Sequence, residues 1–131
     1  MILLQINGSP AKVSNLPELI EAKFKAQFPE HVAYTVPIVI NLTFHFAPNK
    51  KEKVGQPHTK APALKVLADI VIDSLKGLAY KDEKFIYEIH ANKCIGSQEG
   101  IHIHIFNIDE SEYKELTNAI QKSPDTDDSK Q

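Results

Sequence analysis

The chain is built from segments in which apolar residues recur either at every second or at about every fourth position. The longest alternating segment is TVPIVINLTFHF, where Ile38, Ile40, Leu42, Phe44 and Phe46 share one phase. The residues between them are mostly polar. This period predicts a strand with one buried and one solvated face.

Three more segments are predicted strands: residues 1–7, the run KFIYEIHANK and the run EGIHIHIFNI. In the last of these the isoleucines take one phase, and His102 and His104 take the other. The short connection CIGSQ contains a glycine and predicts that the last two strands form a hairpin.

Two helices are predicted between the strands. In the first, Leu16, Ile20, Phe24 and Phe28 recur every four residues, with a proline in the first turn. The second helix has a wider apolar stripe and is followed by Gly77, where a left-handed C-cap residue is expected. Its stripe consists of Leu64, Leu67, Ile70, Val71, Leu75 and Leu78.

A third helix is predicted near the C-terminus, because Asp109 and Glu112 match a capping box. Its apolar face would consist of Tyr113, Leu116 and Ile120. We expect one domain over residues 1–122 and a disordered polar tail over residues 123–131. The order β-α-β-α-β-β-α predicts an α+β fold, with a mixed sheet of about four strands and helices mainly on one face.

The composition is that of a globular protein, and it narrows the kind of nucleic-acid binding to expect. The formal net charge is -2, which argues against a strongly basic protein that wraps nucleic acid. All 15 cationic residues are lysines, so DNA contacts would be lysine–phosphate contacts with little sequence information. The single cysteine, Cys94, and the lack of a signal-like or membrane-spanning run favour a cytoplasmic protein without membrane contact.

Residues 36–108 resemble the RusA family of crossover-junction endodeoxyribonucleases. The resemblance rests on Pro62 at the end of a loop, the run DSLKG over residues 73–77, and the acidic pair Asp82 and Glu83 before a strand. It implies a RusA-like fold and a homodimer that binds four-way DNA junctions. It also implies acidic residues that hold Mg²⁺, which polarises the scissile phosphate and activates water.

The family's signature, Pro-Asp-x-Asp-Asn-Leu-x-Lys followed by an acidic pair, is broken in this chain. Its first Asp falls on Ala63, its second Asp on Lys65 and its Lys on Asp69. Neither alanine nor lysine offers a ligand to a hard divalent cation. Of the acidic pair, Asp82 is retained and Glu83 is a conservative change.

From these replacements we expect a protein that keeps the fold and has lost the Mg²⁺-dependent activity, with no metal or other cofactor. Asp82 and Glu83 are then the remnant of the catalytic site, or else a polar turn before a strand. A metal site rebuilt from Asp69, Asp73 and Asp82 competes with an ion-paired, solvent-facing helix surface. We also predict that Lys65 takes the place of the metal, with its Nζ within about 4 Å of Asp82, Glu83 or Asp69.

The segment APNKKEKVGQPHTKAP is predicted to be a loop rich in lysine. Lys50, Lys51, Lys53 and Lys60 outnumber its single acidic residue. With Lys65 of the following helix they are the candidate DNA-binding residues, because lysine clusters attract phosphate. The alternative is an ordinary solvated loop.

Three histidines, His45, His102 and His104, fall on the polar phase of their strands. If these strands share a sheet face, the histidines gather on one open surface. Such a surface is either a transition-metal site or a hydrophilic face suited to stacking.

The function expected from the sequence is a RusA-like protein that binds branched DNA as a homodimer and does not cleave it. Two alternatives stay open. One is a protein-interaction or regulatory module that uses the dimer surface implied by the family. The other is an active nuclease with a rebuilt metal site.

Overall fold

The structure is a computed structural model and describes residues 1–109. The predicted third helix beyond Asp109, the domain boundary at residue 122 and the polar tail lie outside the described residues. The strands are β1 (Ile2–Asn7), β2 (Ile38–Phe46), β3 (Ile86–Ile95) and β4 (Gly100–Asn107). The helices are α1 (Leu16–Gln27) and α2 (Leu64–Leu75), with short 3-10 helices η1 (Val13–Asn15) and η2 (Glu83–Phe85).

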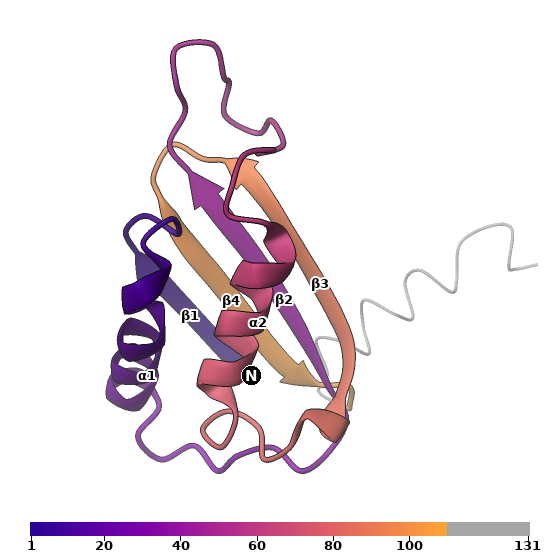
Figure 1. Cartoon of the computed structure of the whole chain (residues 1–131). Helices are drawn as coiled ribbons and strands as arrows, with labels where there is room; N and C mark the ends of the chain where they lie inside the picture. The colour runs from indigo at the N-terminus through magenta and orange to yellow at the C-terminus, as the bar shows by residue number, and fades with distance from the viewer. Residues whose placement is uncertain (110–131) are drawn as a thin grey trace, which may run out of the picture.

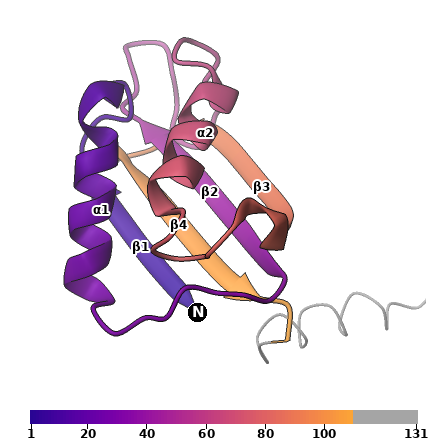
Figure 2. The ribbon, with the colours of Figure 1, turned by 60° about the horizontal axis from the view of Figure 1, so that its bottom comes forward.

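The four strands form one mixed sheet in the order β1-β4-β2-β3 (Figure 1). Strand β4 is antiparallel to both β1 and β2, whereas β3 is parallel to β2. Both α-helices cover the same face of the sheet (Figure 2). The predicted α+β class, with a mixed sheet and helices on one face, is confirmed.

The predicted hairpin between the last two strands is wrong, because β2 lies between β3 and β4. Helix α2 carries the chain from the end of β2 back to its start, so β3 adds parallel to β2 on the outer side. The following turn then crosses the end of β2, where the Gly96 N–H donates to the Phe46 carbonyl at 2.9 Å. A short turn between two strands therefore does not by itself make them neighbours.

The core lies between the helices and the sheet and follows the predicted apolar phases. Helix α1 buries Leu16, Ile20 and Phe24, with Phe28 partly buried beyond its end. From α2 come Leu67, Ala68, Val71, Ile72 and Leu75. The sheet contributes Ile2, Leu4, Ile6, Ile38, Ile40, Leu42, Phe44, Phe46, Ile95, Ile101, Ile103 and Ile105.

Helix α2 ends as the sequence predicted. Gly77 has a φ of 87°, the left-handed conformation that glycine adopts at low cost. Tyr80 is fully buried after this turn, and its hydroxyl donates to the Ile72 carbonyl at 2.6 Å. Within residues 1–109, no helix is long and apolar enough to cross a bilayer.

Candidate functional site

The motif positions that the resemblance identifies lie at opposite ends of α2. Ala63 is the N-cap residue and Lys65 lies in the first turn. Asp82 and Glu83 follow the turn at the other end, where Glu83 Oε2 lies 3.7 Å from Lys76 Nζ. A helix of 12 residues separates the two groups by about 18 Å. One chain therefore does not bring these positions together.

At the head of α2, Lys65 forms an ion pair along its own helix. Its Nζ lies 2.9 Å from Asp69 Oδ2, and its side chain is 86% exposed. The hydrogen bond to Asp69 raises the pKa of Lys65. Of the three contacts predicted for Lys65, the described structure forms the one with Asp69, and this is an ordinary i,i+4 pair.

At the other end, the Asp82 carboxylate serves the local turn. Its Oδ1 accepts a hydrogen bond from the Lys84 backbone N–H at 3.0 Å, which caps η2. This bond, more than the positive charges of Lys76 and Lys84, lowers the pKa of Asp82. The contacts are those of a polar turn before a strand.

Among residues 1–109 of one chain, the side chains are not arranged to hold magnesium. In the described range, no three His, Cys, Asp or Glu side chains are grouped so that they could hold a metal ion. Asp69 is engaged by Lys65, and Asp82 lies beyond the far end of the helix. A site rebuilt from Asp69, Asp73 and Asp82 is therefore not assembled within residues 1–109.

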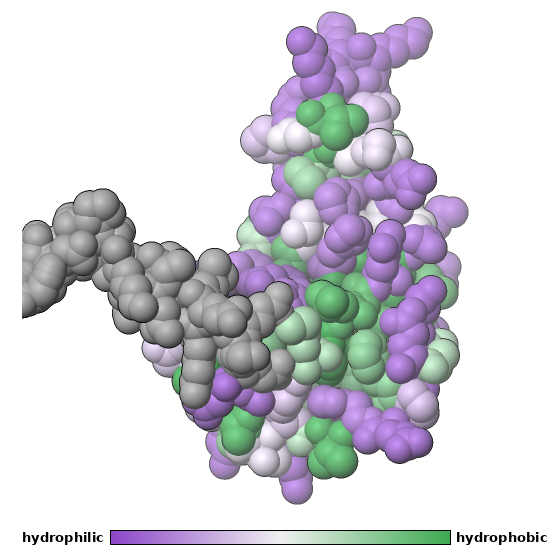
Figure 3. Space-filling view, turned by 180° about the vertical axis from the view of Figure 1, so that it is seen from behind, coloured by the Kyte–Doolittle hydropathy of each residue, from purple (hydrophilic) through white to green (hydrophobic). Residues whose placement is uncertain are grey.

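The predicted lysine loop projects beyond the end of the sheet (Figure 1). Its surface is predominantly hydrophilic, as the view from behind shows (Figure 3). The side chains of Lys50, Lys51, Lys53 and Lys60 are exposed, and no ion pair found within residues 1–109 involves them. Their charges remain available to a phosphate.

The tip of the loop is shaped by its own polar groups. Glu52 Oε1 accepts a hydrogen bond from the Asn49 N–H at 3.0 Å, and Asn49 Oδ1 accepts one from the Lys51 N–H at 2.9 Å. The only acidic residue of the loop thus holds its backbone. The side chains of the loop lysines stay exposed to solvent.

The base of the loop is fastened to β3 by Lys93, a residue that sequence reasoning missed. Its Nζ donates to the carbonyl oxygens of Lys60 and Pro62, each at 2.6 Å. The ammonium thus lies next to the N-cap of α2. A signal was present in the sequence, because Lys93 has the same strand phase as Ala91 and Ile95, which face the helices.

An aromatic stack also holds the loop base. The His58 ring lies flat on the Phe46 ring, with centroids 3.7 Å apart and planes 8° apart. Burial first, and then the charge of Lys93, lowers the pKa of His58. The neutral imidazole is therefore the form that the folded loop favours.

The sheet face turned away from the helices gathers the histidines, as the alternation in the sequence predicted. In the register, Thr43 pairs with His102 and Asn41 pairs with His104, while His45 pairs with Cys94 on the other side. His90 of β3 joins the same face opposite Asn41.

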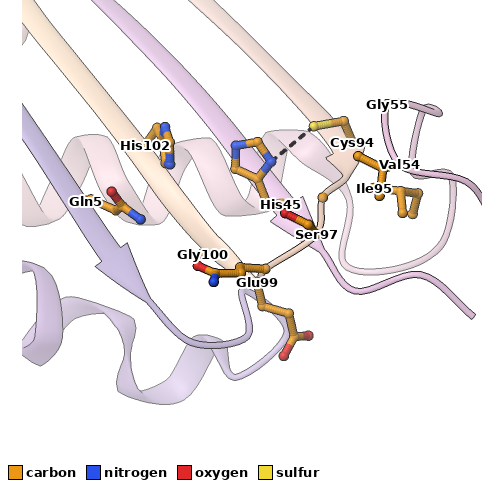
Figure 4. Close-up of a pocket in the computed structure, with 12 residues that line it drawn as sticks. Gln5, His45, Val54, Gly55, Cys94, Ile95, Ser97, Glu99, Gly100 and His102 are labelled. Carbon is orange, nitrogen blue, oxygen red and sulfur yellow. Dashed lines mark hydrogen bonds between the residues drawn. The ribbon is translucent and has the colours of Figure 1, made fainter.

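His45 and Cys94 line a depression of about 420 Å³ on this face (Figure 4). His45 Nδ1 lies 3.4 Å from Cys94 Sγ, and the His45 and His102 ring centroids are 4.8 Å apart. Burial and the nearby His102 lower the pKa of His45, and burial raises the pKa of the Cys94 thiol. A thiol held in its neutral form is a poor nucleophile.

The sequence profile of the endodeoxyribonuclease RusA family matches residues 7–106. The chain therefore belongs to the RusA family, whose members are Holliday junction resolvase-type nucleases. A comparison with curated proteins found no match.

Proposed function

We propose that this RusA-family protein binds branched DNA as a homodimer in the cytoplasm and does not cleave it. The observation that carries the proposal is the chemistry at the head of α2. The two family acids are replaced by Ala63 and Lys65, and a second ammonium, that of Lys93, holds the adjacent carbonyls. Positive charge now occupies the position where a metal site needs anionic oxygens.

The same chemistry supports binding. Four exposed lysines lie in the loop that leads into α2, and Lys65 lies in the first turn of that helix, so a phosphate backbone at this loop would meet ammonium groups. Each lysine–phosphate contact releases counterions from the DNA, which makes such binding sensitive to salt. Since the chain has no arginine, the contacts do not discriminate strongly among base sequences.

The test is an affinity series over rising salt with a four-way DNA junction. Neutralising Lys50, Lys51, Lys53 and Lys60 to glutamine should weaken binding to all sequences alike. It should also make the affinity depend less on salt. The slope of the logarithm of the binding constant against the logarithm of the salt concentration should fall by roughly one unit for each lysine–phosphate pair that the variant no longer forms.

A matched control removes the same charge elsewhere. Glutamine at the exposed Lys12, Lys25, Lys81 and Lys84 should change affinity much less, although the net charge is identical. Equal weakening in the two variants would mean that overall charge, and not the loop, drives binding. Absence of binding by the unaltered protein would favour the protein-interaction alternative.

A further inference from the structure

The sheet face turned away from the helices carries three rows of aligned residues, which we call the polar face. Each row crosses all four strands, because the strand registers set its members opposite one another. In the order β1, β4, β2, β3, the rows are Leu3, His104, Asn41 and His90; Gln5, His102, Thr43 and Asn92; and Asn7, Gly100, His45 and Cys94. None of these positions carries aspartate, glutamate or lysine.

The lack of charged side chains on the polar face narrows the kind of ligand that it suits. Charged residues make up 24% of the chain and belong mostly on its surface. A block of surface without them offers no carboxylate or ammonium group to a charged partner. It offers side-chain amides, a hydroxyl and imidazole rings, which are suited to a flat ligand with hydrogen-bonding edges. The bases of a nucleic acid are ligands of this kind.

The depression of about 420 Å³ at the loop end of the polar face has a size suited to such a group. Gly96 makes room for the His45 ring, since a Cβ at Gly96 would lie 2.8 Å from His45 Nδ1. The ring also contacts Cys94 and, edge to face, the ring of His102. Gln5, His102 and His45 project from neighbouring strands on the same side of the sheet (Figure 4). Since His102 is exposed, its ring is accessible to a ligand.

The lysine loop borders the same depression. Val54 and Gly55 line it, and the Gly55 N–H donates to the Ile95 carbonyl at 2.8 Å, which fixes this part of the loop against the end of β3. The exposed Lys53 immediately precedes Val54. Glu99 also lines the depression, and its carboxylate points away from the two histidines (Figure 4). Rings for bases and ammonium groups for phosphates are therefore neighbours on this side of the molecule.

We propose that the polar face binds the unpaired bases of a single-stranded DNA segment, with one base stacked on His102 and the phosphates contacting the lysine loop. The inference rests on the proposed DNA binding and identifies its substrate class, a branched DNA with a single-stranded arm. In a duplex the faces of the bases are hidden in the stack. In a single strand they are open to aromatic side chains, and histidine is one of those on which bases stack.

Two DNA substrates test the substrate class at one salt concentration. One is a four-way junction whose arms are all double-stranded, and the other is the same junction with one arm left single-stranded. The unaltered protein should bind the second junction more tightly by about five-fold or more, the factor that corresponds to one stacked base. The single-stranded arm carries fewer phosphates, so electrostatic attraction does not produce this gain.

The variant His102→Ala tests the stacking position. It should lose the preference for the single-stranded arm and keep its affinity for the fully double-stranded junction. His102→Tyr restores an aromatic ring and should restore the preference. Tyr87→Ala is the matched control, because it removes an exposed ring (62%) from outside the polar face and should leave the preference unchanged.

Three results would overturn the proposal. They are equal affinity for the two junctions, a preference that survives His102→Ala, and a His102→Ala variant that weakens binding to both junctions alike. In each case the protein still binds the double-stranded junction, so the proposed function stands. Absence of binding to either junction would remove the proposed function itself, and the two failures are therefore distinguishable.

Discussion

Both ends of α2 carry positions of the family motif, yet the two ends differ in which motif residues this chain retains. At the C-terminal end, Gly77 takes its left-handed conformation and Tyr80 donates to the Ile72 carbonyl from a fully buried position. At the N-terminal end, Ala63 offers no capping side chain and Lys65 points into solvent. The C-terminal end thus keeps its turn-forming residues, whereas at the N-terminal end Ala63 and Lys65 stand where the resemblance places two acids.

The largest effect is expected at the C-terminal end, from Tyr80→Phe. The Ile72 carbonyl is one of the helix-terminal acceptors, and losing its buried donor should cost about 1–3 kcal/mol of unfolding free energy. Tyr87→Phe is the control, because Tyr87 is 62% exposed and should change stability by less than about 0.5 kcal/mol. Denaturant unfolding measures both, and equal effects would mean that the Tyr80 hydroxyl does not hold this end.

At the N-terminal end, Lys93→Met should lower the unfolding free energy by about 1 kcal/mol, less than Tyr80→Phe does. The reason is that the carbonyls of Lys60 and Pro62 are partly reachable by water. The loop, no longer fastened to β3, should lose DNA affinity as well. Lys84→Met removes the same charge from an exposed position and serves as control. A Lys93 variant with unchanged affinity would separate loop anchoring from DNA binding.

Lowering the pH should destabilise the base of the lysine loop, at the N-terminal end of α2, before it destabilises the C-terminal end. The pKa values of His45 and His58 are lowered from 6.5, so the unfolded chain binds protons more readily than the folded one below that pH. Their contribution to stability is complete above about pH 6.5 and declines as the pH falls toward the lowered values. Unfolding free energies between pH 8 and pH 5 should show this decline. In the double variant His45→Gln, His58→Gln, the unfolding free energy should fall less between pH 8 and pH 5. If it falls as steeply as in the unaltered protein, these two histidines are not the cause of the decline.

The smallest effect is expected from Lys65→Gln in the isolated protein. Exposed i,i+4 pairs such as Lys65–Asp69 contribute about 0.2–0.5 kcal/mol. Lys25→Gln, which breaks the pair with Glu21, is a comparable control. A clearly larger loss of stability for Lys65→Gln than for Lys25→Gln would mean that Lys65 does more than form this exposed pair.

Sequence periodicity was sufficient for most of the fold. The alternation from Ile38 to Phe46 and the four-residue spacing from Leu16 to Phe24 each match a buried face, because burial is what selects those periods. The neighbours of β3 could not be predicted in the same way. Whether a turn joins adjacent strands depends on the crossover through α2, which no local pattern encodes.

The candidate site was predictable in its residue types and not in its geometry. Family positions gave Ala63, Lys65 and Asp82, yet their separation along α2 appears only once the helix is placed in space. Lys93 was missed because its partners are backbone carbonyls 31 and 33 residues away, and backbone acceptors leave no mark in a sequence. A lysine in the helix-facing phase of a strand was the one available sign.

The central claim is binding without cleavage, and one assay on a four-way junction tests it most directly. The protein is incubated with labelled junction in Mg²⁺ or Mn²⁺, and each mixture is divided between a native gel and a denaturing gel. We predict a salt-sensitive shift on the native gel and intact strands on the denaturing gel with both metals. Cleaved strands with either metal, at a rate proportional to protein concentration, would contradict the account and show that this chain is an active nuclease.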